Sequence, residues 1–489
     1  MARSFEERGD GRPDGRDVAS DPPEDSSRPV LAEAPPSRRD FLKQTVVGAF
    51  GARRLLAGAA GVGAAATASG CSLLEGREMD EFPVAVKDGL EPFDQRDMLF
   101  TFASSEKLNA KHPERTEKFG GFSFHKKMTT TYLKGPFREE PGYSQIDRAL
   151  ERASWEANNH MAPEQQFGRP DSGMLTWDQS DVAETKVEFA SHDEAALAIK
   201  SAARAYSATR CGITRRDPRW DYDPLYDISE ERTLSWEDDF PFEPKTVIVM
   251  LVEMDYVATR ASPSWAHNAS VGEGYSMATK CAGQMAKFLR LCGYHAVGAQ
   301  NDLGMSVPYA VSAGLGEGAR NGALIAPTIG PRHRMCKVYT DLEFIEYDQP
   351  RDFGVASFCA NCKRCADSCP SEAITQADGP SWGPEYEGGD DPEYAYHGRS
   401  GVLKYHNDAK KCLRFWIEND GGCSNCITSC PYNKPDFWHH RFVDAQNVIA
   451  PGPMHSFMRE MDIWFGYGTV SDPARVVALW KSGKNMRGG

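Results

Sequence analysis

The sequence predicts an α/β core followed by a cysteine-rich domain, and three observations lead to this expectation. The apolar run at residues 246–252 is typical of a buried strand. Residues 275–292 place apolar side chains along one helical face. Eight of the thirteen cysteines fall between Cys359 and Cys430. A chain of 489 residues, of which 40% are hydrophobic and 26% charged, is long enough to bury more than one core.

The N-terminal segment, residues 1–71, has the composition of a leader. Residues 1–36 are polar and rich in Pro, Asp, Glu and Arg, which predicts disorder. Arg38-Arg39, followed by DFLK and an apolar stretch rich in Ala and Gly, resembles a twin-arginine export signal. Because Arg53-Arg54 interrupt the apolar stretch, a basic helix start before a poor membrane segment is the alternative.

An export signal would place the mature protein at the periplasmic face of the cytoplasmic membrane. The ATA sequence at residues 66–68 is a candidate cleavage site, and Cys71 is a candidate for a lipid anchor. After the leader we find no run of about 18 apolar residues, so we expect no membrane span in the mature chain.

The core is expected at residues 186–345, after an N-terminal region at 72–185. A capping box at residues 191–194 opens a predicted helix that ends near Ala203. The strand at 246–252 precedes the helix at 275–292, and residues 294–299 are a candidate for the next strand. The apolar face of the second helix consists of Met277, Cys281, Met285, Phe288, Leu289 and Cys292. This alternation predicts an α/β lobe with a layered sheet.

The cysteine-rich domain, residues 346–440, has the spacing of a bacterial ferredoxin. Cys359, Cys362, Cys365 and Cys369-Pro370 match CxxCxxCxxxCP, a run whose fourth cysteine binds the other cluster when two clusters are present. A second block supplies Cys412, Cys423, Cys426 and Cys430-Pro431. Exchanging the last cysteines gives one set of Cys359, Cys362, Cys365 and Cys430 and another of Cys369, Cys412, Cys423 and Cys426. We expect two [4Fe-4S] clusters, with zinc sites as the alternative.

Electron transfer alone does not identify a substrate. The glycines of GLGEG, residues 314–318, lack the GxGxxG spacing of a dinucleotide site. The formal net charge of -14 argues against a nucleic-acid partner. A set of tryptophans could line a pocket, although core positions are the simpler interpretation: Trp155, Trp177, Trp382, Trp416, Trp438 and Trp464.

Several segments together resemble the catalytic subunit of respiratory reductive dehalogenases. They are GLGEGARNG, GPRHR followed by KVYTDL, residues 241–256 and 293–302, and the two cysteine blocks behind a twin-arginine leader. The resemblance covers about residues 120–440. It implies a nitroreductase-like α/β core that binds a corrinoid (cobalamin) base-off, two [4Fe-4S] clusters, and a C-terminal segment at 441–489. The residues it implies for corrinoid binding are Gly314, Gly316, Asn321 and Gly330.

The same resemblance implies catalytic roles for Tyr275, Asn301 and Arg334. Tyr275 would protonate the carbon that loses its halide. A guanidinium next to a phenol stabilises the phenolate, which is the role expected of Arg334. Asn301 would hydrogen-bond the halide or the substrate. The implied partners are a small organohalide, a small membrane-anchor protein and an electron donor from the membrane chain.

Two other functions remain alternatives. Epoxyqueuosine reductase, a cytosolic tRNA-modifying enzyme, shares the corrinoid core and the double ferredoxin motif, but it would carry no export signal and should present basic surface to tRNA. The other alternative is an iron–sulfur electron-transfer subunit. Such a subunit would bind no corrinoid, and a substitution of Tyr275 would cause no loss of a reaction.

Overall fold

The computed structural model describes residues 75–118, 137–162, 171, 173–344, 346–386, 399–435, 437, 440 and 452–485. Every feature below belongs to one compact unit, Thr67–Gly489. The predicted twin-arginine motif, the cleavage site, Cys71 and Trp438 lie outside the described residues. None of the described helices is both long and apolar enough to cross a membrane.

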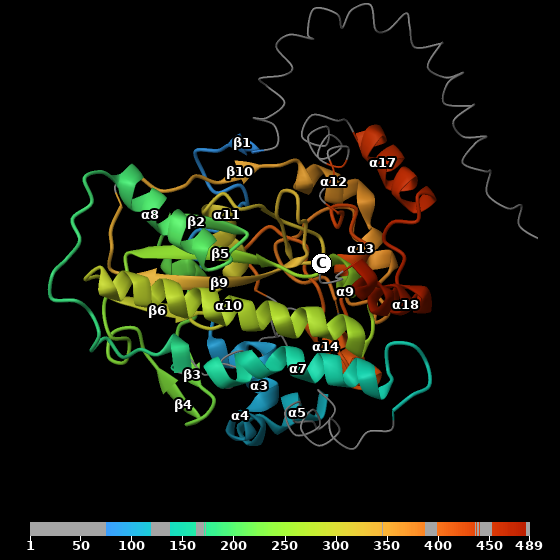
Figure 1. The fold of residues 1–489 in the computed structure, drawn as a ribbon, viewed down its shortest axis with the longest axis horizontal. Coiled ribbons are helices and arrows are strands. Elements are labelled where there is room, and N and C mark those ends of the chain that lie inside the picture. Colours follow the sequence, from blue (N-terminus) through green and yellow to red (C-terminus); the bar gives the residue numbers. More distant parts are fainter. Residues whose placement is uncertain are drawn as a thin grey trace, which may run out of the picture. The chain divides into compact units, whose positions relative to one another are not determined.

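A four-stranded antiparallel sheet forms the centre of this unit (Figure 1). Its strands, in spatial order, are β2 (Arg210–Arg215), β5 (Thr246–Glu253), β9 (His333–Thr340) and β6 (Ala296–Ala299). The strand predicted at residues 246–252 is confirmed, and the one expected at 294–299 begins two residues later. On β5, Ile248 lies opposite Ile213 of β2 and Val338 of β9.

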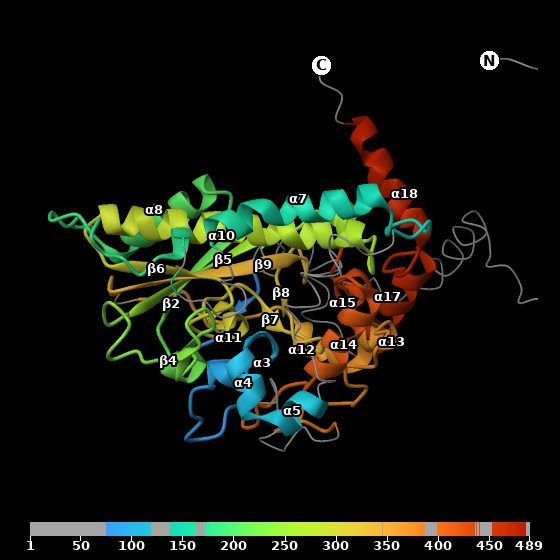
Figure 2. The same ribbon diagram turned by 90° about the horizontal axis from the view of Figure 1, so that it is seen from below.

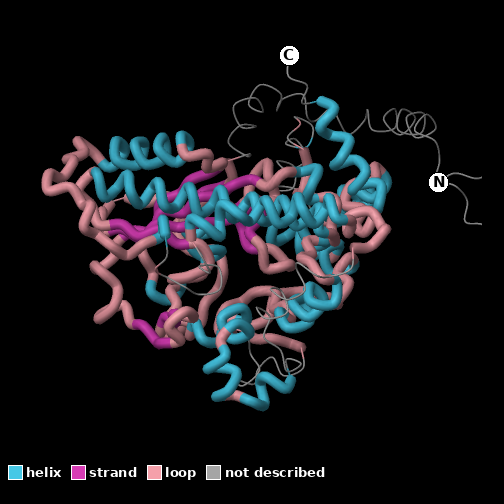
Figure 3. Tube along the Cα trace, turned by 60° about the horizontal axis from the view of Figure 1, so that its bottom comes forward, coloured by secondary structure: helices cyan, strands magenta, loops and turns pink. Residues whose placement is uncertain are grey.

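Two helices, α8 (His192–Ala205) and α10 (Trp265–Leu291), cover one face of the sheet, and α7 (Gln145–Met161) packs along α10 on the same side (Figure 2). Figure 3 shows the same layers coloured by secondary structure. Cys281, Met285 and Leu289 of α10 are fully buried against the even-numbered side chains of β5, which confirms the predicted apolar face. Ser191 caps α8, because its hydroxyl accepts a hydrogen bond from the Glu194 amide at 3.1 Å. The helix predicted from residue 275 begins earlier, at Trp265, where Ser264 is the cap.

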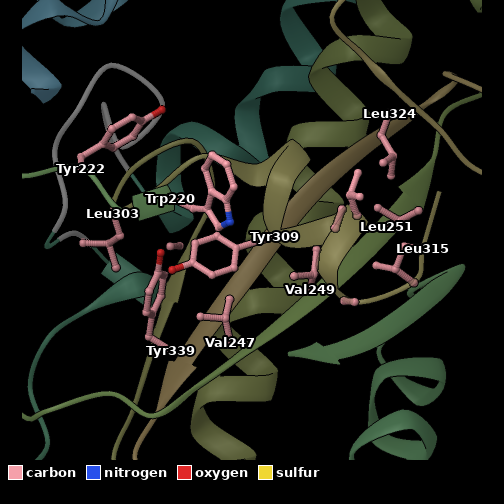
Figure 4. Close-up of a cluster of buried hydrophobic side chains, with 14 of the residues drawn as sticks. Trp220, Tyr222, Val247, Val249, Leu251, Leu303, Tyr309, Leu315, Leu324 and Tyr339 are labelled. Carbon is pink, nitrogen blue, oxygen red and sulfur yellow. The ribbon is translucent and has the colours of Figure 1, made fainter. Parts of the chain in front are cut away.

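The opposite face of the sheet packs on a second core (Figure 4). The odd-numbered side chains Val247, Val249 and Leu251 of β5 contribute to it, together with Tyr309 of α11 (Ser306–Ser312) and Tyr339 of β9. Alternate side chains of β5 therefore reach two different cores, as expected of a strand covered on both faces. Short elements complete this layer: η6 (Pro218–Trp220), β3 (Leu225–Asp227), β4 (Arg232–Leu234), β7 (Glu317–Gly318) and β8 (Leu324–Ile325).

The N-terminal region supplies more than connections. Its long helix α7 packs along α10, so this region and the predicted core share one interface. Its other elements are β1 (Arg77–Glu78), η3 (Gln95–Asp97), α3 (Leu99–Ser104), α4 (Glu106–Lys111), α5 (Pro113–Lys118) and η5 (Gly173–Leu175). The strand β1 pairs with β10 (Arg351–Asp352), which precedes the first cysteine of the cysteine-rich domain.

The cysteine-rich segment forms short helices beyond one end of the sheet (Figures 1 and 2). They are α12 (Val355–Cys362), α13 (Arg364–Asp367), α14 (Ala409–Asn419) and α15 (Asn425–Thr428). The C-terminal helices α17 (Gly452–Trp464) and α18 (Pro473–Ser482), with η7 (Gly483–Asn485), follow. A short helix, α9 (Tyr256–Thr259), leads from β5 towards α10, and Thr259 accepts a hydrogen bond from Thr428 of α15 through its carbonyl. This contact joins the sheet layer to the cysteine-rich segment.

Candidate functional site

Tyr275, Asn301 and Arg334 lie together although they come from three different elements. Tyr275 belongs to α10, Asn301 to the turn after β6, and Arg334 to β9. The Asn301 amide nitrogen Nδ2 donates to the Tyr275 hydroxyl at 2.9 Å. The guanidinium carbon of Arg334 lies 5.0 Å from the centroid of the Tyr275 ring. The three residues that the sequence predicts are thus neighbours, and their catalytic roles stay a prediction.

The close approach of Arg334 to Tyr275 depends on a glycine. A Cβ at Gly274 would lie 2.8 Å from the Arg334 side-chain carbon Cγ, so a larger residue would displace the guanidinium. The Arg334 Nε atom is buried and has no hydrogen-bond partner among the described residues. A buried donor without a partner is uncommon, which leaves this N–H available for a bound group.

Two buried histidines lie near Arg334. Burial, and secondarily the charge of Arg334, lowers the pKa of His267 to about 3. Burial also lowers the pKa of His333 to about 4. Both imidazoles are therefore neutral at physiological pH. The positive charge beside Tyr275 comes from Arg334 and not from an imidazolium.

Tyr275 and part of the cysteine-rich segment belong to the same hydrophobic cluster. Its ring stacks on Trp155 of α7, with the centroids 5.2 Å apart and an angle of 23° between the planes. Both rings and Cys426 pack against one small hydrophobic cluster formed by Met254, Val271 and Ile427. Trp155 was one of several tryptophans named from the sequence, but only the fold shows that it stacks on Tyr275. The candidate acid therefore lies in an apolar cluster that it shares with a candidate cluster ligand.

The electrostatic neighbours of Cys430 and Cys412 belong to the same predicted sets as these two cysteines. Burial, followed by the charges of Cys359, Cys362 and Cys365, raises the pKa of Cys430. Burial raises the pKa of Cys412 to about 12, with further contributions from Cys423 and Cys369. This grouping supports the exchange of the last cysteine between the two blocks.

Thiols with raised pKa values are protonated when no metal is bound, and metal binding must displace those protons. Burial raises the pKa of Cys359 to about 12 and that of Cys423 to about 11. Burial also raises the pKa of Cys426, with contributions from Cys423, Cys412 and, from the other set, Cys365. The charge of Cys365 acts on Cys426, so these members of the two predicted sets lie near each other.

A small pocket, partly open to solvent, is lined by all four cysteines of the first set. Arg320 also lines it and is 1% exposed. Its guanidinium donates to the Cys359 carbonyl at 3.0 Å and lies 4.1 Å from the Tyr405 ring centroid. A buried cation beside four cysteines would favour a cluster that carries negative charge. No three His, Cys, Asp or Glu side chains of the described residues are already arranged to hold a metal ion, so cluster binding here stays a prediction.

Two of the glycines predicted to bind the corrinoid have close backbone neighbours in the structure. Gly314 has a φ of +67°, and a Cβ there would lie 2.4 Å from the Gln349 carbonyl oxygen. A Cβ at Gly316 would lie 2.2 Å from the Ile325 carbonyl oxygen. Packing alone therefore explains both glycines, and a role in cofactor binding stays a prediction.

The other two predicted corrinoid contacts, Gly330 and Asn321, face the cysteine-rich segment. Gly330 has a φ of +58°, and a Cβ there would lie 2.2 Å from the Tyr432 carbonyl oxygen. Asn321 lines the pocket of the first cysteine set, and its Nδ2 donates to the carbonyl of Cys426, in the second set, at 3.4 Å. The glycine-rich segment thus connects the core to both cysteine sets.

Residues 358–434 match the family model of the 4Fe-4S dicluster domain. The chain is 37% identical to a tetrachloroethene reductive dehalogenase of Desulfitobacterium hafniense over 341 residues, which cover 62% of this chain. The chain spans 60% of the length of that relative. It is 29% identical to the tetrachloroethene reductive dehalogenase of Sulfurospirillum multivorans over 492 residues, which cover 92% of this chain and 94% of the relative.

The fold is also similar to that of solved structures. The structure reported as "Reductive dehalogenase structure suggests a mechanism for B12-dependent dehalogenation" superposes with a TM-score of 0.59 at 21% identity. The superposition covers 81% of this chain and 50% of the other. By sequence and by fold, the chain is a relative of the reductive dehalogenases and contains a 4Fe-4S dicluster domain.

Proposed function

We propose that the protein is a corrinoid-dependent reductive dehalogenase. The reaction converts R–X, two electrons and one proton into R–H and X⁻. The observation that carries the proposal is the position of Tyr275, which is hydrogen-bonded by Asn301, faces Arg334 and packs in the same hydrophobic cluster as Cys426. A proton donor next to an electron-transfer domain is what a reductive protonation requires. The names of the relatives support the same reaction.

Tyr275 would give its proton to the carbon that loses the halide. Its oxygen accepts the hydrogen bond from Asn301, so the phenol hydrogen remains free to be donated. Arg334, over the ring face, would stabilise the negative charge left on the phenolate. Trp155 stacks on the Tyr275 ring and would help to exclude water.

A bound corrinoid would supply the low-valent cobalt that breaks the carbon–halogen bond. We propose Gly314, Gly316, Asn321 and Gly330 as its contacts. The Nε–H of Arg334, which has no hydrogen-bond partner among the described residues, is a further candidate donor. The two cysteine sets would hold the [4Fe-4S] clusters through which electrons arrive one at a time.

Tyr275→Phe tests the proposal directly. Protein reconstituted without oxygen should contain about one cobalt and about eight iron per chain, and it should release halide from brominated or chlorinated aromatics or alkenes with reduced viologen. We expect Tyr275→Phe to lower this rate by about 10²-fold to 10⁴-fold, because general acid catalysis contributes that much. The metal content should not change.

Tyr206→Phe, at the end of α8, is the matched control and should turn over normally. Normal turnover of Tyr275→Phe would overturn the assigned role of Tyr275. About eight iron without cobalt, and no halide release, would instead favour an electron-transfer subunit.

We also propose that Arg38-Arg39 direct export, and that a small membrane-anchor protein holds the enzyme at the periplasmic face of the membrane. The support is the sequence motif alone. Replacing both arginines by lysine should keep the protein in the cytoplasm of its native host, as measured by cell fractionation. Unchanged export of this variant would contradict the proposal.

A further inference from the structure

Lys337 is a buried lysine that none of the steps above uses. It lies on β9 opposite Ala299, the last residue of β6, and is fully buried. Its ammonium nitrogen donates to the Gln300 carbonyl at 2.5 Å and to the Ser306 hydroxyl at 2.7 Å. A buried ammonium is costly in free energy unless it is well paired, so packing alone does not account for it.

Both acceptors of Lys337 belong to one turn. This turn begins at Gln300, directly after β6, and ends at Ser306, the first residue of α11. Asn301, the residue that donates to the Tyr275 hydroxyl, is the second residue of the turn. Lys337 therefore joins the two ends of the segment that presents Asn301.

The Gln300 side chain ties the same turn to the helices α10 and α7. Its Nε2 donates to the main-chain carbonyl of Tyr275 at 3.0 Å and to Asn158 of α7 at 3.1 Å. The Gln300 carbonyl accepts the hydrogen bond from Lys337. The Gln300 amide donates to the Asp302 carboxylate at 2.9 Å. The peptide group before Asn301 is thus fixed on one side by α10 and α7 and on the other by Lys337.

The charges of Lys337 and Asp302 act on each other near this turn. Burial lowers the pKa of Lys337 to about 8, and the charge of Asp302 opposes that shift. Burial raises the pKa of Asp302 to about 7, and Lys337 opposes that shift. Asp221 and Cys336 are the other ionisable groups that act on Lys337. A buried ammonium that donates to two acceptors holds its position.

We propose that Lys337 is a positioning residue of this site, which holds the Gln300–Ser306 turn so that the Asn301 amide stays on the Tyr275 hydroxyl. The inference rests on the proposed dehalogenase function, because it assigns to Lys337 an effect on the same acid. Lys337 itself does not touch the substrate. It acts through Asn301, and the experiment must therefore detect that dependence.

A double-mutant cycle measures the dependence. Lys337→Met should lower kcat for halide release by about 100-fold, since a small misplacement of a catalytic group has an effect of that size. Asn301→Ala should lower kcat comparably, and adding Lys337→Met to it should cause little further loss. Losses that multiply would overturn the proposal, because residues that act independently are additive in free energy. Lys200→Met, which removes a surface ion pair with Asp348, is the matched control and should turn over normally.

A second measurement does not depend on turnover. With 3-fluorotyrosine at position 275, the ¹⁹F chemical shift should move in Lys337→Met in the same direction as in Asn301→Ala. If the wild-type protein releases no halide, the proposed function fails, and the ¹⁹F shifts still decide whether Lys337 positions Asn301. An unchanged shift in Lys337→Met would overturn the inference.

If Lys337→Met does not fold, Ser306→Ala replaces it. This variant removes one of the two acceptors and leaves the Gln300 contact in place. We expect a several-fold loss of kcat and a smaller ¹⁹F shift of the same sign. No change in either quantity would overturn the inference.

Discussion

Asn301 donates its hydrogen bond to the Tyr275 oxygen. The phenol hydrogen is not used in this bond and can therefore be donated to the substrate. Without the amide, the acid is still present but its orientation is no longer fixed. We expect Asn301→Ala to lower kcat for halide release by about 10²-fold, the usual effect of removing one preorganised donor. In Asn301→Asp the new side chain has a similar size but cannot donate a hydrogen bond when it is ionised. We therefore expect the loss of kcat to be at least as large as in Asn301→Ala. A fully active Asn301→Asp variant would show that the amide donor is not needed.

The residue types of this site could be named from the sequence, but their contacts could not. Tyr275, Asn301 and Arg334 stood out through a resemblance to a family. Gln300 carries no such signal, since a glutamine next to a predicted site residue is usually a surface residue. Its hydrogen bonds to Asn158 and Tyr275 exist because α7 packs along α10, which no local pattern shows.

Glu317 should make the stability of the protein depend on pH. It accepts the Phe353 and Val355 amides at 3.0 and 2.7 Å near the start of α12, and burial raises its pKa to about 7. The folded state thus keeps a proton that the unfolded state loses near pH 4.5. Glu317 therefore contributes its full stabilisation below pH 4.5, and this contribution is lost as the pH rises towards 7. The loss in the free energy of unfolding is on the order of 3 kcal/mol.

Glu317→Gln keeps the acceptor oxygen and removes the titration. We expect its melting temperature to fall less than that of the wild type between pH 5.5 and pH 8, and to be higher than the wild type at pH 8. Glu418→Gln, an exposed residue on α14, is the control and should follow the wild type. If Glu317→Gln keeps the full pH dependence, Glu317 is not its source.

At the scale of elements, α10 shows where sequence patterns stop being informative. Its second half has an apolar and a polar face, and that half could be predicted. Nearly all side chains from Trp265 to Gly274 are buried, because α7, α9 and the cysteine-rich segment surround this half. A helix buried on all sides has no polar face and therefore no amphipathic period. Tyr275 lies at the junction of the two halves, where the surroundings change.

A substitution at Gly330 can distinguish a packing role of this glycine from a role in binding the corrinoid. A Cβ at this position would lie 2.2 Å from the Tyr432 carbonyl, in a backbone conformation with φ +58°. Gly330→Ala should therefore destabilise the protein by about 2 kcal/mol or more, the usual effect of such strain, and should lower its iron content. The melting temperature and the iron content should fall even in protein prepared without corrinoid.

Gly318→Ala is the matched control for Gly330→Ala. A Cβ there would find its nearest neighbour, a Val307 methyl carbon, at 4.0 Å, so stability and iron content should not change. If Gly330→Ala affected corrinoid binding alone, with iron content and melting temperature unchanged, the position would be a cofactor contact and not a packing glycine.

At the scale of the whole molecule, the alternation of helices and strands predicted a layered α/β core but not its connections. The sheet is antiparallel throughout, and β9, late in the chain, lies between β5 and β6. Local patterns do not specify which strands pair. The strand β9 was also hidden, because Arg334 and Lys337 interrupt its apolar run, and each of them is held by contacts with distant segments.

The arrangement of the eight cysteines makes a prediction for the whole dicluster domain. If the last cysteines are exchanged, Cys369→Ala and Cys412→Ala remove the same cluster, and each variant should retain about four iron per chain. The Cys369/Cys412 double variant should lose no further iron, whereas the Cys365/Cys369 double variant should lose both clusters.

An unexchanged arrangement would give the opposite result, since Cys365 and Cys369 would then belong to one cluster and their double variant would keep about four iron. Iron analysis and electron paramagnetic resonance of the reduced proteins distinguish the two arrangements. The electrostatic grouping of Cys430 with Cys359, Cys362 and Cys365 favours the exchange. In that arrangement each block of the sequence contributes to both clusters, so neither cluster can form until the two blocks have packed together.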